Sequence, residues 1–243
     1  MNKFLCVLVI PFLTACSSSK QATVAEFSAV PQSAMQQLNN SHFDRFVVSH
    51  PEVFSRYNKV IFFPMQFDRL TVDSNADKDL RNSWYDSSWD EMDSICQYFD
   101  DFAQKIFNER AGFSTTLQGG KDVLAVEFRL KNFMPYNKRY KDNNLGTVGV
   151  SSDEKGIGTV TFQAVIADSQ SGELLAVIED GMEVNTGNIA INGNLNLQVD
   201  SNNKTSQNQA WRKVFKRWVE YLHDDLSSLQ SSSLAQMQAQ GSD

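Results

Sequence analysis

The sequence predicts a single α+β domain, in which a mainly antiparallel sheet is covered on one face by two amphipathic helices in a βαβββα-like order. Three segments in the middle of the chain alternate apolar and polar residues, as half-buried strands do. Two other segments repeat apolar residues every three or four positions, as helices with one buried side do. A sheet with one apolar face needs a cover, and two helices on that face are the simplest arrangement of layers.

The first elements are a strand and a helix. Lys59–Phe63 is continuously apolar after its lysine and precedes Pro64, which cannot donate a ladder hydrogen bond, so we expect a buried strand to end there. Ser87 and Ser88 stand before Asp90 and Glu91 as in a capping box, and Gly112 is the expected end of the helix that follows. The apolar stripe of this helix consists of Met92, Ile95, Phe99, Phe102, Ala103 and Ile106.

The alternating segments come next. Leu124–Leu130 is apolar at every second position, and Glu127, Arg129 and Lys131 are expected on a solvent-facing side. Val160–Ile166 and Leu174–Ile178 repeat this pattern, and the polar, glycine-containing loop Asp168–Gly172 between them is typical of a hairpin. A second, more polar hairpin is predicted to turn at Asn192-Gly193.

The closing helix is predicted from about Ser206. One side of it is apolar and the other is charged, as expected for a helix that covers a sheet. The apolar stripe consists of Trp211, Val214, Phe215, Trp218, Leu222 and Leu226.

The N-terminus predicts export and a lipid anchor. Lys3 precedes an apolar run, Phe4–Leu13, which has the form of a signal peptide and is shorter than the roughly 20 residues of a membrane span. Leu13-Thr14-Ala15-Cys16 resembles the lipobox of bacterial lipoproteins, which implies cleavage before Cys16 and acylation, including palmitate-type chains, of that residue. The alternative is an ordinary secretory signal that happens to precede a cysteine. Ser17, in place of Asp, implies by the same resemblance the periplasmic face of a Gram-negative outer membrane, with surface display left open.

These features divide the chain into four parts. Residues 1–15 are the predicted signal peptide, and residues 16–42 are the lipidated Cys16 with a flexible tether rich in Ser, Gln, Ala and Asn. Residues 43–229 form the α+β domain. Residues 230–243 are a polar, low-complexity tail that we expect to be disordered.

Charge and cysteine content narrow the function. The chain has 22 basic and 29 acidic residues and a net charge of −7, which does not suit a general nucleic-acid binder. Because Cys6 leaves with the signal peptide and Cys16 is acylated, Cys96 is the one cysteine of the folded part, and no internal disulfide is expected. The simplest interpretation of Cys96 is a small, buried apolar residue.

Three segments together resemble a known family. They are Tyr57–Ile61 with the following Pro64, Asp168–Ala176, and the closing helix with Trp211 and Trp218. They are similar to bacterial lipoproteins of domain of unknown function 3313, over about residues 25 to 226. The resemblance implies a location in the cell envelope rather than an activity, and the polar stretch 183–204 is longer than this family leads us to expect.

Catalytic and metal-binding signatures are missing from the sequence. It contains no Gly-x-Ser-x-Gly, His-Glu-x-x-His, Cys-x-x-Cys or Gly-Lys-Ser/Thr motif, and we predict no catalytic residue, cofactor or metal. Asp73–Asp79 places oxygen ligands on alternate residues, but Lys78 replaces the turn glycine and Trp84 the bidentate glutamate of a calcium loop, which favours a solvated acidic loop and leaves cation binding open. The three histidines are scattered: His42, His50 and His223.

Two clusters are candidates for partner binding. Trp84, Tyr85 and Trp89 are either an aromatic platform for a sugar or peptide, or a staple that holds a helix to the core. The second cluster is a basic patch that suits anionic lipid headgroups or an acidic partner, or is simply a solvated helix face; it consists of Arg212, Lys213, Lys216 and Arg217.

The function predicted from these features is that of a non-enzymatic envelope lipoprotein. It binds or scaffolds another envelope protein or polymer, through an exposed sheet face or the region Trp84–Trp89. The alternative is a hydrolase or transferase that acts on an envelope polymer, which would need a pocket with converging carboxylates or histidine.

Overall fold

The computed structural model of the protein describes residues 35–85, 90–139, 157–185, 189–191, 195–197 and 204–240. Eight strands form one sheet in the order β1-β2-β8-β7-β6-β3-β5, with β4 beside β6. The pairs from β1 to β6 along this order are antiparallel, whereas β3 is parallel to both β6 and β5 and β4 is parallel to β6. The strands are β1 (Gln36–Gln37), β2 (Arg45–Val48), β3 (Lys59–Phe62), β4 (Thr71–Val72), β5 (Ser114–Thr115), β6 (Val123–Pro135), β7 (Gly158–Asp168) and β8 (Leu174–Val184).

The parallel pair of β3 and β6 follows from the helices between them. The chain leaves β3, passes through α1 (Lys78–Tyr85) and α2 (Asp90–Glu109), and returns into β6. A connection that crosses the sheet through a helix brings the next strand back in the same direction. Gly112, three residues after the end of α2 and within the bend that follows it, has a φ of 106°, which an L-residue rarely adopts, and the predicted end of this helix is thereby confirmed.

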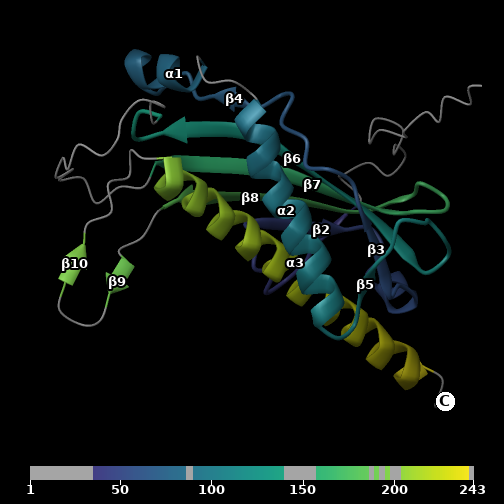
Figure 1. The fold of residues 1–243 in the computed structure, drawn as a ribbon. Helices are drawn as coiled ribbons and strands as arrows, with labels where there is room; N and C mark the ends of the chain where they lie inside the picture. The colour runs from purple at the N-terminus through teal and green to yellow at the C-terminus, as the bar shows by residue number, and fades with distance from the viewer. Residues whose placement is uncertain are drawn as a thin grey trace, which may run out of the picture.

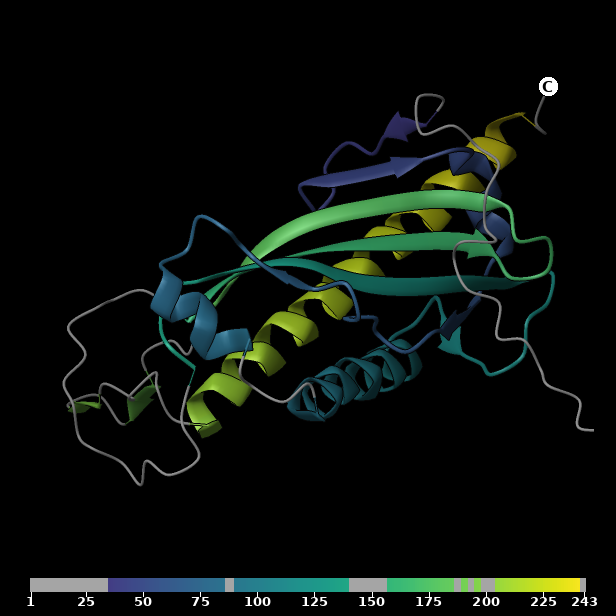
Figure 2. The ribbon, with the colours of Figure 1, turned by 90° about the horizontal axis from the view of Figure 1, so that it is seen from above.

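Helices α2 and α3 (Lys204–Gln240) cover the same face of the sheet (Figures 1 and 2). Trp218 of α3 packs on Phe162 of β7 with ring centroids 4.2 Å apart, and Phe215 meets Phe99 of α2 at 6.2 Å. Fully burying an aromatic ring of this kind stabilises the fold by roughly 2 to 3 kcal/mol. The predicted stripe of α3 and the α+β class are therefore confirmed.

The predicted hairpins and the buried cysteine are confirmed as well. β7 pairs with β8 across the loop Asp168–Gly172. β9 (Ile189–Ile191) pairs with β10 (Leu195–Leu197), although the predicted turn between them lies outside the described residues, as does the capping segment before α2. Burial, aided by the charges of Asp100 and Asp93, raises the pKa of the Cys96 thiol to about 12, so this thiol is unreactive at neutral pH.

The predicted tether boundary at residue 42 is wrong. β1 pairs with Val47 and Val48 of β2, so the ordered domain already includes residues from the end of the predicted tether. Ser41 and His42 are bound to Asp225 of α3, at distances of 2.6 to 3.1 Å. Composition alone missed this segment because a backbone ladder and one distant carboxylate hold it, rather than apolar residues of its own.

The predicted disordered tail is also wrong up to Gln240, because α3 continues to that residue. Leu229 and Ser233 are buried against the 3-10 helix Pro51–Arg56, here called η3. The Ser233 hydroxyl donates to the Pro51 carbonyl and the Gln230 amide to the Tyr57 carbonyl, each at 2.6 Å. Ser and Gln look like linker residues in the sequence, yet here their side chains satisfy backbone carbonyls of a neighbouring element.

Glu127 lies on the predicted side of β6, the same side as Arg129, but it is only 8% exposed, so the expectation that it is solvated is wrong. It lies on β6 beside Arg129, whose guanidinium donates to it at 3.1 Å. A buried carboxylate is tolerated where a charge-assisted hydrogen bond accompanies it. Among the described residues, no helix has both the length and the apolar character that a membrane span requires.

Candidate functional site

The predicted lipidation site, Cys16, and the aromatic residue Trp89 lie outside the described residues. Of Tyr85 the structure describes only the backbone, at the end of α1. Trp84 is partly buried against the core: its ring meets Phe133 edge-on at 4.6 Å, and its Nε1 donates to the Asn137 carbonyl at 2.9 Å. This packing favours the staple over the platform for Trp84, and a binding role for the three aromatics stays a prediction.

The four basic residues of α3 are all exposed, in two rows one turn long. Arg212 and Lys216 face α2: the guanidinium lies 4.4 Å from the Tyr98 ring centroid, and the Lys216 ammonium is 3.7 Å from Glu220. Lys213 and Arg217 instead line a hollow beside the end of β8. The four residues of the predicted patch therefore do not form one surface, because one row faces α2 and the other lines the hollow.

The sheet face opposite the helices, here called the outer face, is organised in rows across β2, β8, β7 and β6. Strand register places residues of similar character opposite one another, because side chains alternate between the two faces. The first row is apolar on β2, β8 and β7, where it belongs to a small buried cluster, and continues to Glu127 on β6. The next row is charged or amide-bearing, and the third is small. These rows are Val47, Val177 and Val165; then Arg45, Glu179, Gln163 and Arg129; then Gly181 and Thr161.

The polar rows, apart from Arg129, line a groove of about 400 Å³, here called the outer-face groove. Its second row is tied together: Arg45 donates to Glu179 at 3.0 Å, and Gln163 donates to the same carboxylate at 2.9 Å. Gly181 leaves the groove open, since the nearest atom to a Cβ at this position is the Thr161 methyl at 3.4 Å. The remaining lining residues are Asp44, Lys131, Phe162 and Asp180.

Two carboxyl groups meet at one end of the outer-face groove. Asp180 is 8% exposed and accepts hydrogen bonds from Trp218 Nε1 at 3.0 Å and from the Asp44 backbone N–H at 3.3 Å. Asp44 in turn accepts from the Gly181 N–H at 3.3 Å. Burial, reinforced by the charge of Asp44, raises the pKa of Asp180 to about 6. Asp180 stands opposite Phe162 of β7 and binds Trp218 of α3, so its carboxyl group, which titrates near neutral pH, borders the groove from the helix-covered side of the sheet.

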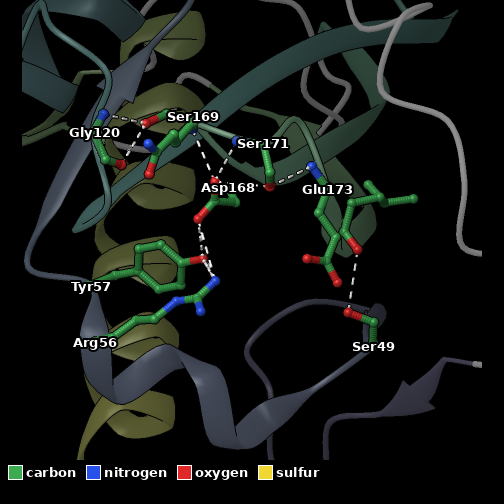
Figure 3. Close-up of polar contacts among 10 residues, drawn as sticks. Ser49, Arg56, Tyr57, Gly120, Asp168, Ser169, Ser171 and Glu173 are labelled. Atoms are coloured by element: carbon green, nitrogen blue, oxygen red, sulfur yellow. Dashed lines mark hydrogen bonds and ion pairs between the residues drawn. The ribbon is translucent and has the colours of Figure 1, made fainter.

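The predicted hairpin loop forms a separate polar cluster around Asp168 (Figure 3). One carboxylate oxygen accepts from the backbone N–H groups of Gln170 and Ser171, at 3.0 and 2.7 Å, and the other accepts from the Tyr57 hydroxyl at 2.7 Å. Arg56 is 3.3 Å from the same oxygen. Burial alone would raise the pKa of Asp168, but these hydrogen bonds outweigh it and hold the pKa below its usual value.

Tyr57 is the other half of this cluster. Burial raises the pKa of its hydroxyl to about 12, so it stays a neutral donor to Asp168. Ser169, next in the loop, exchanges hydrogen bonds with the backbone of Gly120 at 2.9 and 3.1 Å (Figure 3). Every oxygen of the cluster has a structural use, and we interpret it as a clamp that joins the hairpin to η3 and the loop before β6.

The acidic loop Asp73–Asp79 uses its carboxylates locally. Asp73 accepts from the Asn75 N–H at 2.8 Å and from the Asn132 amide at 2.7 Å, and Asp77 caps α1 by accepting from the Asp79 N–H at 2.8 Å. Within the part of the chain that the structure describes, no three His, Cys, Asp or Glu side chains are placed to hold a metal ion.

None of the three histidines lines the outer-face groove. His42 stacks on Tyr221 and its Nδ1 lies 2.6 Å from Asp225, while His50 lies 3.5 Å from Glu52. His223 is 4% exposed between α2 and α3, and burial lowers the pKa of its imidazole.

The sequence did not predict the residues of the outer-face groove as a site. Gln163 stands at a polar position of the predicted strand Val160–Ile166, and Glu179 directly follows the predicted strand Leu174–Ile178. Their meeting with Arg45 required β2 and the register of three strands, and neither is visible in a single alternating segment.

No protein-family model matches this sequence, and no curated protein is significantly similar to it. Among solved structures, it is similar to protein XCC0632 from Xanthomonas campestris, of the domain-of-unknown-function family DUF330, with 7% identity, a TM-score of 0.37, and coverage of 72% of this chain and 88% of that one. It is also similar to a putative neuraminyllactose-binding hemagglutinin homolog from Helicobacter pylori, with 14% identity, a TM-score of 0.31, and coverage of 72% of this chain and 90% of that one. The PelC dodecamer from Paraburkholderia phytofirmans has 12% identity and a TM-score of 0.28, with coverage of 66% of this chain and 88% of that one. Such distant similarity gives no indication of function.

Proposed function

We propose that this chain is a non-enzymatic lipoprotein of the cell envelope, anchored through lipid on Cys16 at the periplasmic face of the outer membrane. It binds another envelope protein or polymer through the outer-face groove. The observation that carries this proposal is the groove itself, which crosses four strands on the sheet face that α2 and α3 leave uncovered. The resemblance to domain of unknown function 3313 belongs to the same proposal.

The chemistry of the groove suits a polar, extended partner. Its side chains offer both hydrogen-bond donors and hydrogen-bond acceptors. The charges of Arg45 and Glu179 already neutralise each other, because these two side chains form an ion pair. A partner therefore gains from hydrogen bonds along the row rather than from net charge. A polypeptide segment or a glycan strand has the required density of such groups.

Site-specific crosslinking in intact cells tests this function. We expect a photoreactive residue at Lys131, in the groove, to give a discrete crosslinked product, and the same residue at Lys105, exposed on α2, not to give it. Gly181→Leu should remove the product because the new side chain fills the groove. The protein should still fold, since a Cβ at this position makes only ordinary contacts. Gly181→Ala is the matched control and should reduce the product only slightly.

Labelling with palmitate in the same cells tests the anchor. The crosslinked product should carry the label in the wild-type chain and lose it in Cys16→Ser. Unlabelled wild-type protein would contradict lipidation, and identical products from Lys131 and Lys105, or a product that survives Gly181→Leu, would contradict the groove as the binding site.

A hydrolase or transferase acting on an envelope polymer is the second candidate. The observation that favours it is that two carboxylate residues, Asp44 and Asp180, line the same groove. Turnover of an envelope polymer that is lost in both Asp180→Asn and Asp44→Asn, with binding retained, would establish this function instead.

A further inference from the structure

A second hollow lies between the end of β8 and the first half of α3. It shares no lining residue with the outer-face groove. Figure 1 shows the start of α3 beside the start of β7 and the end of β8, and α3 contacts β8. The hollow measures about 360 Å³. Its lining residues are Met182, Glu183, Asn185, Lys213, Val214 and Arg217. We call it the Lys213–Arg217 pocket.

The pocket carries two cations in an acidic protein. Lys213 and Arg217 are four residues apart on α3, so their side chains project from the same side of the helix, one turn apart. Arg217 makes no ion pair with any described residue, in contrast to Lys216 on the neighbouring row, which faces Glu220. The net charge of the whole chain is −7, whereas these two side chains are positively charged. The pocket therefore attracts an anion.

The other walls define what kind of anion fits. Val214 is buried and Met182 is partly buried against the core, so both give the pocket an apolar side. The acidic residue in the lining is Glu183, whose carboxylate accepts from the Asn185 amide at 3.4 Å. A hollow of about 360 Å³ has the size of a small-molecule site and can hold a small headgroup.

We propose that the Lys213–Arg217 pocket binds the headgroup of an anionic phospholipid. The phosphate lies between the ammonium and guanidinium groups, and the first carbons of the lipid lie against Met182 and Val214. Clusters of basic side chains at a membrane surface recognise anionic headgroups in this way. The proposal does not depend on the outer-face groove, and it would give the domain a second membrane contact besides the lipid on Cys16.

Titration with short-chain lipids tests the pocket. Residues 16–243 carrying Cys16→Ser are titrated in a calorimeter with monomeric dihexanoyl phosphatidylglycerol, dihexanoyl phosphatidylcholine and glycerol 1-phosphate. We expect saturable binding of the phosphatidylglycerol, at least tenfold weaker binding of the phosphatidylcholine, and weaker binding of glycerol 1-phosphate because it lacks the apolar part. Glycerol 1-phosphate that binds as tightly as the lipid would overturn the lipid assignment in favour of a soluble phosphate.

Charge reversals on the two rows of α3 provide the matched control. Lys213→Glu and Arg217→Glu should each weaken phosphatidylglycerol binding at least tenfold, whereas Arg212→Glu and Lys216→Glu, with the same charge change on the same helix, should change it less than threefold. Glu183→Gln should tighten binding several-fold by removing the acidic group from the wall. Equal losses from both rows, or no effect of Glu183→Gln, would overturn the pocket. Melting curves of each variant show whether the fold is retained.

Discussion

Asp180 shows how a single side chain links the groove to the core. One of its oxygens holds the Trp218 indole, which is fully buried, and the other holds the backbone at Asp44, on the groove wall. Its desolvation is the cost of this position, and the raised pKa of about 6 reflects it. The carboxyl group therefore makes the stability of the fold depend on pH.

The variant Asp180→Asn should change this dependence in a definite direction. Because the folded state holds the proton more tightly than the unfolded chain, whose pKa is about 3.9, the contribution of Asp180 to stability is fully present below about pH 4. It is lost as the pH rises to about 6. Asparagine does not titrate, so the free energy of unfolding of the variant relative to wild type should rise by up to about 3 kcal/mol between pH 4 and pH 7. Urea unfolding at several pH values measures this difference, and a constant difference would contradict the assignment.

Asp168 shows which part of a residue's role a sequence can predict. The loop Asp168–Gly172 indicated a turn, because an aspartate can accept hydrogen bonds from N–H groups two and three residues ahead, and it does. Its second oxygen binds Tyr57, which is 111 residues away. No local pattern contains that information, since it depends on where η3 packs.

At the scale of elements, the end of α3 is the clearest departure from the sequence-based expectation. A helix of Ser, Gln and Leu has little stability of its own and depends on tertiary contacts. Those contacts are the buried side chains of Leu229 and Ser233 and the hydrogen bonds to η3.

Truncation after Leu229 should therefore destabilise the domain. It removes two side-chain hydrogen bonds to backbone carbonyls and the buried Ser233, and we expect a loss of about 2 kcal/mol, since each such bond contributes roughly 1 kcal/mol. Truncation after Gln240 removes only residues beyond α3 and should leave the urea midpoint unchanged. Equal midpoints for the two truncations would restore the interpretation of residues 230–243 as a loose tail.

The strands were predictable to different degrees for a related reason. β6, β7 and β8 each bury a row of large side chains, so alternation reveals them one by one. β1, β4 and β5 have two residues each, and they exist because a neighbour offers hydrogen bonds. The groove depends on register between strands, so its rows appear only when the sheet is assembled.

At the scale of the whole molecule, the two ends of the described chain meet. Asp225, in the second half of α3, is 3% exposed and accepts from the Ser41 hydroxyl, from the His42 N–H and from the His42 ring at 2.6 to 3.1 Å. Residues 41–42 lie between β1 and β2, so this contact holds the connection between the first two strands to α3. If Cys16 carries lipid, as we propose, a force from the membrane reaches the domain at β1 and at this contact.

Replacement of Asp225 should loosen the contact between residues 41–42 and α3 without unfolding the domain. Asp225→Ala removes the acceptor of three donors, and we expect it to cost about 2 to 3 kcal/mol because charged hydrogen-bond partners are lost in a buried place. The Leu38 N–H, which donates to Phe46 at 2.7 Å, should exchange with solvent faster, while amides in the centre of β8 should keep their protection. Asp224→Ala is the control, since this neighbouring, more exposed carboxylate pairs with Arg110 and should cost less than about 1 kcal/mol. Hydrogen exchange of both variants decides the matter, because unchanged Leu38 exchange in Asp225→Ala would mean that β1 is held without this carboxylate.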